Sequence, residues 1–342
     1  MKSKMQYLSF LNVISCIAVI MLHTNGCFWA FSHERYWVTA NVIESVMYFA
    51  VPVFFMISGA TLIDYRERYS TKTFMKKRIK KTVIPFLFWS LFGLIYMTIK
   101  YPENPSNFGI IHIVSKLINT QIISIYWFFM PLFSVYMSIP IISLIPKEQR
   151  KEKFLYLVII SFITSSLIPF VCSLIDIQYN NSLMVQFGNS YMIYVIVGYL
   201  IDNYEIPKKL RIFIYVFSFV GLGLHLFGTY YLSINSNRII DTFKGYNNVP
   251  CFIYSVGIFV FFKYFKVPLK LSTVFNRIIN LSKYTFGAYL MHFFIIDISL
   301  EVLKIDNRNI YFRVFAPFVI FIICIFIENI VKKVPLLRTV LP

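Results

Sequence analysis

Apolar runs of about 20 residues recur along the sequence from one end to the other. A helix of about that length crosses the hydrocarbon core of a bilayer and satisfies its own backbone polar groups there. Ten such runs can be counted, at 8–31, 41–63, 82–99, 122–145, 154–175, 184–201, 210–232, 248–265, 284–303 and 310–331. The sequence therefore predicts an all-α polytopic membrane protein with about ten transmembrane helices.

The composition argues against a soluble protein, because only 14% of the 342 residues are charged, against about a quarter in soluble domains. The apolar runs are evenly spread, so we expect residues 1–342 to form a single membrane domain with no appended soluble domain. The net charge of +18 lies in short loops between the runs, which favours a bilayer partner over nucleic acid. The five cysteines are scattered and lack metal-ligand spacing, so we expect no metal site.

The distribution of Lys and Arg predicts the orientation of the chain. If the N-terminus is cytoplasmic, 25 of the 33 basic residues fall in cytoplasmic segments, and the largest group of them lies in the loop 66–81. Positively charged residues are enriched in cytoplasmic loops of membrane proteins. We therefore expect both termini to be cytoplasmic.

The first apolar run contains a histidine, His23, although an ionisable side chain inside a membrane span is energetically costly. Asn12 precedes it by eleven residues, which is about three helical turns and roughly 16 Å. Both side chains should therefore lie on one stripe of the helix. Such a stripe suits a functional path through the membrane, although a histidine that only bridges helices is the simpler interpretation.

The second run carries Glu44 near its outer end. Since the first run leads outward and the second returns, Glu44 and His23 can lie together in the outer half of the membrane. A carboxylate beside the imidazole would orient it and raise its basicity. The alternative is that Glu44 only reaches the water at the lipid headgroups.

Three further groups of residues are candidates for binding. Lys77, Arg78 and Lys81 lie at the entrance to the third run, where a basic cluster suits phosphate groups or anionic lipid. Tyr289 and His292 put polar groups into the otherwise apolar ninth run. Trp127, in the fourth run, lies near the outer interface, where aromatic residues also serve as simple membrane anchors.

These features together resemble the acyltransferase-3 family of bacterial membrane O-acyltransferases. The resemblance rests on His23 in the first run, the Pro-Val-Phe-Phe-Met-Ile-Ser-Gly string at 52–59, and the basic entry with Ile-Pro at 77–85. A Trp-Phe pair at 127–128 and the stretch from Ser282 to His292 complete it. The order and placement of the five motifs carry the resemblance, which covers nearly the whole chain.

The resemblance implies a ten-helix core in the bacterial cytoplasmic membrane. It also implies acetyl transfer from cytoplasmic acetyl-CoA to a hydroxyl of a cell-surface or exported glycan. The family's first span commonly has Arg or Lys eleven residues before the histidine, and here that position is Asn12. We expect Lys77, Arg78 and Lys81 to supply the positive charge for the phosphates of acetyl-CoA, and Asn12 to lie beside its arm.

The expected reaction centre is His23, either as general base on the acceptor hydroxyl or as a transient carrier of the acetyl group. Glu44 would hold its tautomer, and Trp127, Tyr289 and His292 would bind sugar or stabilise the oxyanion. A proton-coupled transporter or flippase is the main alternative, because intramembrane His and Glu also suit a carrier. A structural subunit of an export complex is a third possibility, and it predicts that His23 can be replaced without loss of function.

Overall fold

The computed structural model describes residues 2–100, 109–185 and 191–341, and these residues form helices and loops without a strand. The helices are α1 (Lys2–Thr24), α2 (Arg35–Met47), α3 (Ala50–Leu62), α4 (Thr71–Arg78), α5 (Ile84–Lys100), α6 (Ile110–Ile118), α7 (Phe129–Ile142), α8 (Arg150–Phe162), α9 (Ile168–Leu174), α10 (Met192–Asn203), α11 (Lys208–Gly223), α12 (Thr229–Ser236), α13 (Val249–Tyr264), α14 (Ser272–Ile279), α15 (Thr285–Glu301) and α16 (Ile310–Val331). The all-α prediction is confirmed.

Every run predicted from the sequence contains a helix, but the helices differ in length. Among the described residues, seven helical segments are long and apolar enough to cross a membrane, and α13 with the segment 269–301 forms a further pair bent by 100°. Helix α10 is shorter, and five residues of its predicted run, 186–190, lie outside the described residues. The chain is thus a polytopic membrane protein, and the number of ten crossings stays a prediction.

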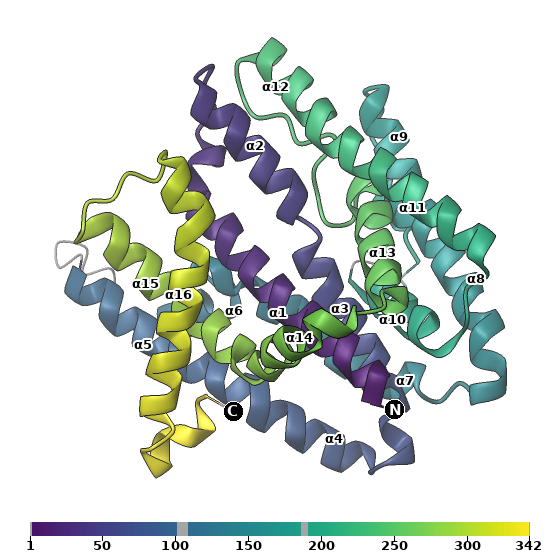
Figure 1. Ribbon diagram of the computed structural model, residues 1–342, viewed down its shortest axis with the longest axis horizontal. Coiled ribbons are helices and arrows are strands. Elements are labelled where there is room, and N and C mark those ends of the chain that lie inside the picture. Colours follow the sequence, from purple (N-terminus) through teal and green to yellow (C-terminus); the bar gives the residue numbers. More distant parts are fainter. Residues whose placement is uncertain (1, 101–108, 186–190, 342) are drawn as a thin grey trace.

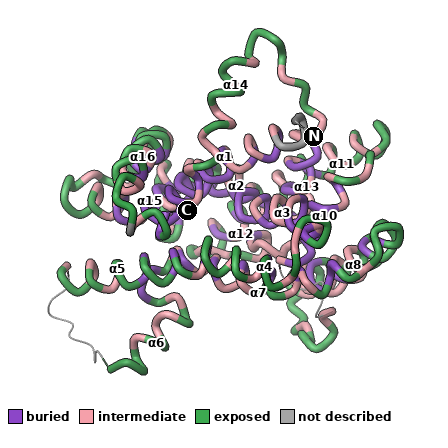
Figure 2. The backbone as a smooth tube through the Cα atoms, turned by 90° about the horizontal axis from the view of Figure 1, so that it is seen from below, coloured by how far each residue is buried: buried purple, intermediate pink, exposed green. Residues whose placement is uncertain are grey.

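Helix α1 lies in the middle of the molecule and packs against α2, α3, α13, α15 and α16 (Figure 1). Its residues are largely buried, whereas α5, α8, α11 and α16 expose much of their surface (Figure 2). The exposed residues of these outer helices are mostly large and apolar, as in Ile99, Phe219 and Phe326. Apolar side chains suit contact with lipid, so the outer helices surround a core that contains α1 and its polar side chains.

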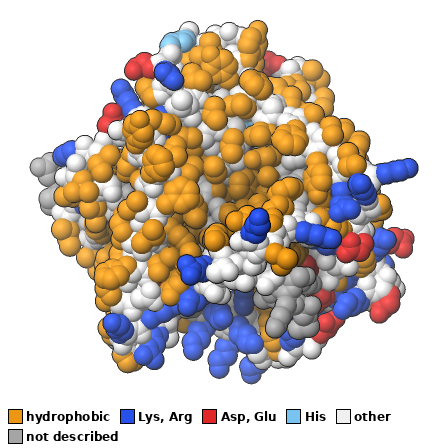
Figure 3. Space-filling view, viewed as in Figure 1, with side chains coloured by type: hydrophobic (Ala, Val, Ile, Leu, Met, Phe, Trp, Pro, Cys, Tyr) orange, Lys and Arg blue, Asp and Glu red, His pale blue; other side chains and the backbone are white. Residues whose placement is uncertain are grey.

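Basic side chains gather along the lower edge of the molecule in Figure 3, whereas most of the remaining face is apolar. The start of α1, the end of α16 and helix α4 lie at this edge in Figure 1. One basic edge is what the predicted orientation requires of a cytoplasmic face. That the termini are cytoplasmic remains a prediction.

A break between α2 and α3 shapes the second run near its middle. Pro52 lies in the first turn of α3 and has no backbone N–H, so it leaves the carbonyl of Tyr48 without its helical partner. The thiol of Cys251 in α13 lies 3.9 Å from that carbonyl oxygen, and the Tyr254 hydroxyl donates to the carbonyl of Val46 at 2.9 Å. A neighbouring helix thus satisfies the broken turn, as expected for proline in a membrane helix.

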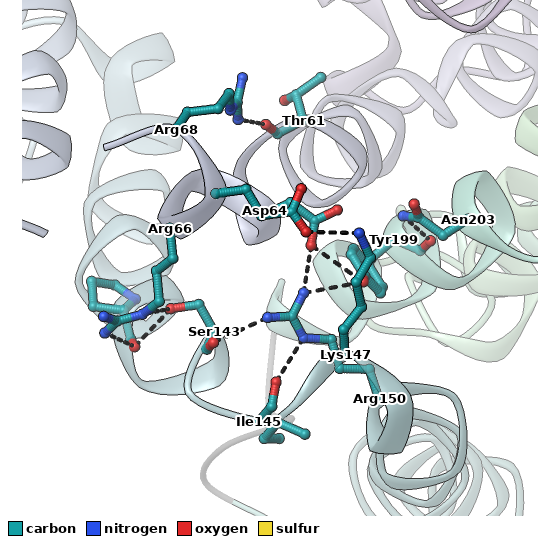
Figure 4. Close-up of polar contacts among 12 residues, drawn as sticks. Thr61, Asp64, Arg66, Arg68, Ser143, Ile145, Lys147, Arg150, Tyr199 and Asn203 are labelled. Atoms are coloured by element: carbon teal, nitrogen blue, oxygen red, sulfur yellow. Dashed lines mark hydrogen bonds and ion pairs between the residues drawn. The ribbon is translucent and has the colours of Figure 1, made fainter. Parts of the chain in front are cut away.

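A buried arginine ties three elements together at the other end of α3 (Figure 4). Arg150, at the start of α8, forms an ion pair with Asp64, which follows α3. Its guanidinium also donates to the carbonyls of Ser143 at 3.0 Å and Ile145 at 2.8 Å, and to the Tyr199 hydroxyl on α10 at 3.1 Å. This network fixes α8 and α10 against the end of α3.

Two glycines allow α3 and α10 to cross at close range. A Cβ atom on Gly59 would lie 1.8 Å from the carbonyl oxygen of Val195, and one on Gly198 would lie 2.4 Å from the Cα atom of Met56. Both obstacles are backbone atoms, which cannot turn away as a side chain can. Small residues at helix crossings are typical of membrane proteins.

We therefore expect Gly59→Ala to lower the free energy of unfolding by at least about 1–3 kcal/mol, the usual cost of overpacking. The change is measured as a loss of thermal stability of the detergent-purified protein. Gly223→Ala in α11 is the matched control, because a Cβ there meets nothing within 4 Å. An equal loss in both variants would contradict the close crossing.

Candidate functional site

Two histidines meet where α1 and α15 pack together. The rings of His23 and His292 lie with their centroids 5.2 Å apart and their planes at 33°. His292 is fully buried, whereas His23 is partly exposed toward a cavity. Among the described residues, the ring nitrogens of His23 have no hydrogen-bond partner, so they are open to a ligand.

The polar stripe predicted on α1 also meets α15 farther toward the N-terminus of α1, where Asn12 lies. The side-chain amide of Asn12 donates to the Thr285 hydroxyl at 2.9 Å and to the Ser282 carbonyl at 3.4 Å. Asn12 and His23 therefore both contact α15 or the turn before it, three turns apart on one unbroken helix. The seam between α1 and α15 carries polar groups at both ends.

A cavity of about 470 Å³ lies beside His23. Four residues that the sequence singled out line it: His23, Glu44, Trp127 and Tyr289. The remaining lining residues are mostly apolar or aromatic: Val19, Leu22, Trp29, Tyr48, Val51, Phe54, Ser124, Ile125, Phe128 and Tyr246. A largely apolar cavity with a few polar groups is typical of a small-molecule site.

The aromatic side chains of the cavity differ in what they can donate. The Tyr289 hydroxyl already donates to the carbonyl of Ile125 at 2.6 Å, so its oxygen is left as an acceptor. The Trp127 ring stacks on Tyr246, with centroids 5.4 Å apart. Its indole N–H has no partner among the residues that the structure describes. Trp127 is thus an available hydrogen-bond donor and Tyr289 is not.

The tautomer of His292 follows from its own hydrogen bond. Its Nδ1 lies 3.1 Å from the carbonyl oxygen of Ala288, and a carbonyl can only accept, so Nδ1 carries the proton. In the neutral ring, Nε2 is then the basic nitrogen, and in the described part of the chain this buried atom has no partner. Neutral His292 can therefore accept a proton, but it cannot donate to an oxyanion through Nε2.

The carboxylate of Glu44 is bound by a residue that the sequence did not single out. Lys244, in the loop between α12 and α13, donates to Oε1 of Glu44 at 2.9 Å, and both side chains are almost fully buried. The ammonium lies 3.8 Å from the centroid of the Tyr48 ring. No hydrogen bond joins Glu44 to His23 among the described residues, so the orienting role expected for Glu44 stays a prediction.

The polar contacts extend from Glu44 to a buried arginine in α16. The amide of Asn25 lies 3.5 Å from Oε2 of Glu44, and its oxygen accepts from Arg313 at 3.2 Å. Arg313 also donates to the Thr39 hydroxyl at 2.8 Å and to the Tyr36 carbonyl at 3.2 Å. This network joins α16 and α2 to the turn after His23.

The three basic residues expected to hold the donor lie away from this cavity. Lys77 and Lys81 are exposed, and the ammonium of Lys77 lies 3.9 Å from the centroid of the Tyr69 ring. Arg78 is half-buried between the rings of Phe74 and Tyr136. A π-helical turn, η3 (Ile79–Val83), follows, so regular α-helical spacing does not relate Arg78 to Lys81.

Sequence reasoning missed Lys244, Arg313 and Tyr246. Lys244 and Tyr246 lie in the loop between the runs 210–232 and 248–265, and nothing in their spacing indicates burial. An Arg within the tenth run was a usable signal, because a charged residue there requires partners. Within the described residues, no group of three or more His, Cys, Asp or Glu side chains could hold a metal ion.

A comparison with known protein families identifies the family of the chain. The family model of the acyltransferase-3 family, described as an acyltransferase domain, matches residues 5–328. No curated protein and no solved structure matches the chain. The matched residues run from the first turn of α1 into α16. They include His23, His292 and the residues that line the cavity. The chain belongs to the acyltransferase-3 family and is a membrane acyltransferase.

Proposed function

We propose that the protein is an O-acetyltransferase of the bacterial cytoplasmic membrane. It moves an acetyl group from cytoplasmic acetyl-CoA to a hydroxyl of a cell-surface or exported glycan. The observation that carries the proposal is the position of His23, whose ring faces an apolar cavity and lies against His292. The family supplies acyl transfer as the reaction, and the donor and acceptor are our proposal.

The chemical step needs a base at the acceptor hydroxyl. His23 removes the hydroxyl proton while the oxygen attacks the thioester carbon, and collapse of the tetrahedral intermediate breaks the C–S bond. The imidazolium then returns the proton to the thiolate, which leaves as CoA. His292 supports this cycle with a basic Nε2 close to His23, and the Trp127 indole is a donor available to the oxyanion.

An acetyl-histidine relay is the alternative course at the same residue. In that case a nitrogen of His23 attacks the thioester carbon, the C–S bond breaks, and the proton of the imidazole leaves with the thiolate as CoA. The acceptor hydroxyl then attacks the acetyl carbon, the N–C bond breaks, and the hydroxyl proton returns to the imidazole. The open ring nitrogens of His23 suit either course.

The donor would approach from the basic edge of the molecule. Lys77, Arg78 and Lys81 would bind the phosphates of acetyl-CoA. The pantetheine arm would then follow the seam between α1 and α15, past Asn12. The seam is closed by the Asn12–Thr285 hydrogen bond, so entry of the arm requires the two helices to separate there.

The acceptor would occupy the aromatic part of the cavity. Sugar rings present C–H faces that pack on aromatic side chains, and Trp127 and Tyr246 provide such faces beside His23. The Tyr289 oxygen can accept a hydrogen bond from a sugar hydroxyl, since its own proton is used on Ile125.

The proposal can be tested in everted membrane vesicles from cells that produce the protein. Acetyl-labelled acetyl-CoA is added outside, and alkali-labile label in glycan inside the vesicles is measured against vesicles without the protein. We expect ester-linked label only with the protein present. Absence of label together with proton-driven movement of a glycan or small molecule would favour the transporter or flippase.

We expect the combined substitution of Lys77, Arg78 and Lys81 by Gln to raise the KM for acetyl-CoA by at least about tenfold. Hydrogen bonds to charged groups are worth about 1.5–3 kcal/mol, and three of them are removed. Lys72→Gln, in the same helix, is the control and should leave KM unchanged. A triple variant with wild-type KM would place the phosphates elsewhere.

A further inference from the structure

Buried polar side chains gather at a second place, between α2 and the junction of α11 and α12. Helix α11 passes into α12 through a π-helical turn, η8 (Leu224–Gly228). Asn41 and Ser45 on α2, and His225 and Thr229 on this turn and α12, each expose at most 1% of their surface. Turns of this kind widen a helix and often occur at functional sites.

The two pairs face each other across one interface. The Asn41 amide donates to the carbonyl of Leu226 at 3.0 Å, and the Tyr48 ring lies 4.8 Å from the His225 ring. Ser45 follows Asn41 by about one turn of α2, and Tyr48 follows the end of the helix, so Ser45 lies on the face of α2 that meets this turn. Thr229 follows His225 by about one turn.

Five polar atoms of this cluster have no hydrogen-bond partner among the described residues. They are Oδ1 of Asn41, Oγ of Ser45, both ring nitrogens of His225 and Oγ1 of Thr229. Leaving a buried donor or acceptor unpaired costs about 1–3 kcal/mol, so native proteins rarely leave several together. The four side chains do not satisfy one another with hydrogen bonds, although Asn41 and His225 belong to elements that contact each other.

We infer that internal water binds between α2 and the π-helical turn, held by Asn41, Ser45, His225 and Thr229. The hydroxyls donate and accept, the Asn41 oxygen accepts, and the neutral imidazole does one of each, which matches the bonding of water. A cation fits poorly, because no carboxylate belongs to the cluster and the Lys244 ammonium lies on the neighbouring Tyr48. The site lies behind the cavity wall, which Tyr48 forms.

Isosteric removal of a hydroxyl tests the inference in the purified full-length protein. If water is bound, Ser45→Ala and Thr229→Val each remove one of its partners, and we expect the Tm to fall by about 2–4 °C. If the site is dry, the same changes remove an unsatisfied group and leave the Tm unchanged or higher. Ser134→Ala is the control, because its side chain is exposed on α7 and should leave the Tm unchanged. A fall in Tm no larger than that of Ser134→Ala would overturn the inference.

Hydroxyl-radical footprinting of the wild-type protein gives a second test that needs no variant to fold. Radicals form from water on exposure to X-rays and label side chains that touch it. We expect severalfold more label on His225 than on Phe259, which is equally buried in an apolar core. Equal labelling of the two would overturn the inference. A further result would also overturn it: a wild-type Tm that is higher in Na⁺ than in choline, with no such difference in Thr229→Val. The occupant would then be a cation.

Discussion

Replacing Lys244 with methionine is expected to lower the free energy of unfolding by about 3–5 kcal/mol. The substitution keeps the length of the side chain but leaves the buried Glu44 carboxylate without its cation, and an uncompensated buried charge carries a cost of that size. Thermal or denaturant unfolding of the detergent-purified protein measures the change. The same variant should loosen the loop that brings Tyr246 to the cavity wall.

The double variant Glu44→Gln, Lys244→Met is the control for this prediction. Burial lowers the pKa of Lys244 even though the Glu44 carboxylate opposes the shift, so desolvation of the ammonium outweighs the pairing. Neutralising both partners should therefore recover most of the lost stability. Wild-type stability in the single variant, or no recovery in the double variant, would contradict a buried ion pair at the cavity.

His23→Ala is expected to reduce the rate of acetyl transfer about 10²–10⁴-fold, the range that general-base catalysis contributes. The KM for acetyl-CoA should change little, because the phosphates are proposed to bind at Lys77, Arg78 and Lys81. Initial rates in everted vesicles, at equal amounts of membrane protein, provide the measurement. His112→Ala is the control, since His112 is exposed on α6 away from the cavity.

Loss of affinity for acetyl-CoA with an unchanged maximal rate in His23→Ala would place His23 in binding and not in chemistry. Full activity would instead favour the structural-subunit interpretation of the sequence.

The placement of Asn12 and His23 shows what could be predicted from the sequence. Both lie on one unbroken helix, α1, so the rotation of about 100° per residue holds between them and the shared stripe follows. Their common neighbour, α15, could be proposed only from the family motif, because the packing partner of a helix depends on the whole fold. The structure shows contacts of both residues with α15 or the turn before it.

Predictions from residue spacing were wrong or incomplete where a helix is irregular or where a contact comes from a loop far away in the sequence. The π-helical turn after Arg78 breaks the regular helical spacing between Arg78 and Lys81. Pro85, which cannot donate a hydrogen bond to the carbonyl of Lys81, lies two residues after this turn and is a signal for it in the sequence. The partner of Glu44 lies 200 residues away in the chain. In the sequence, Lys244 is one of several basic residues in loops. In the structure, its loop folds so that the ammonium lies over the Tyr48 ring.

The central claim is that His23 transfers an acetyl group to a glycan hydroxyl, and NMR of glycan O-acetylation tests it most directly. Three strains are compared: one without the protein, one with the wild-type protein and one with His23→Ala at equal membrane level. We expect O-acetyl signals with the wild-type protein only. Signals of equal intensity with His23→Ala would remove His23 from the chemistry, and their absence with the wild-type protein would contradict the proposed reaction.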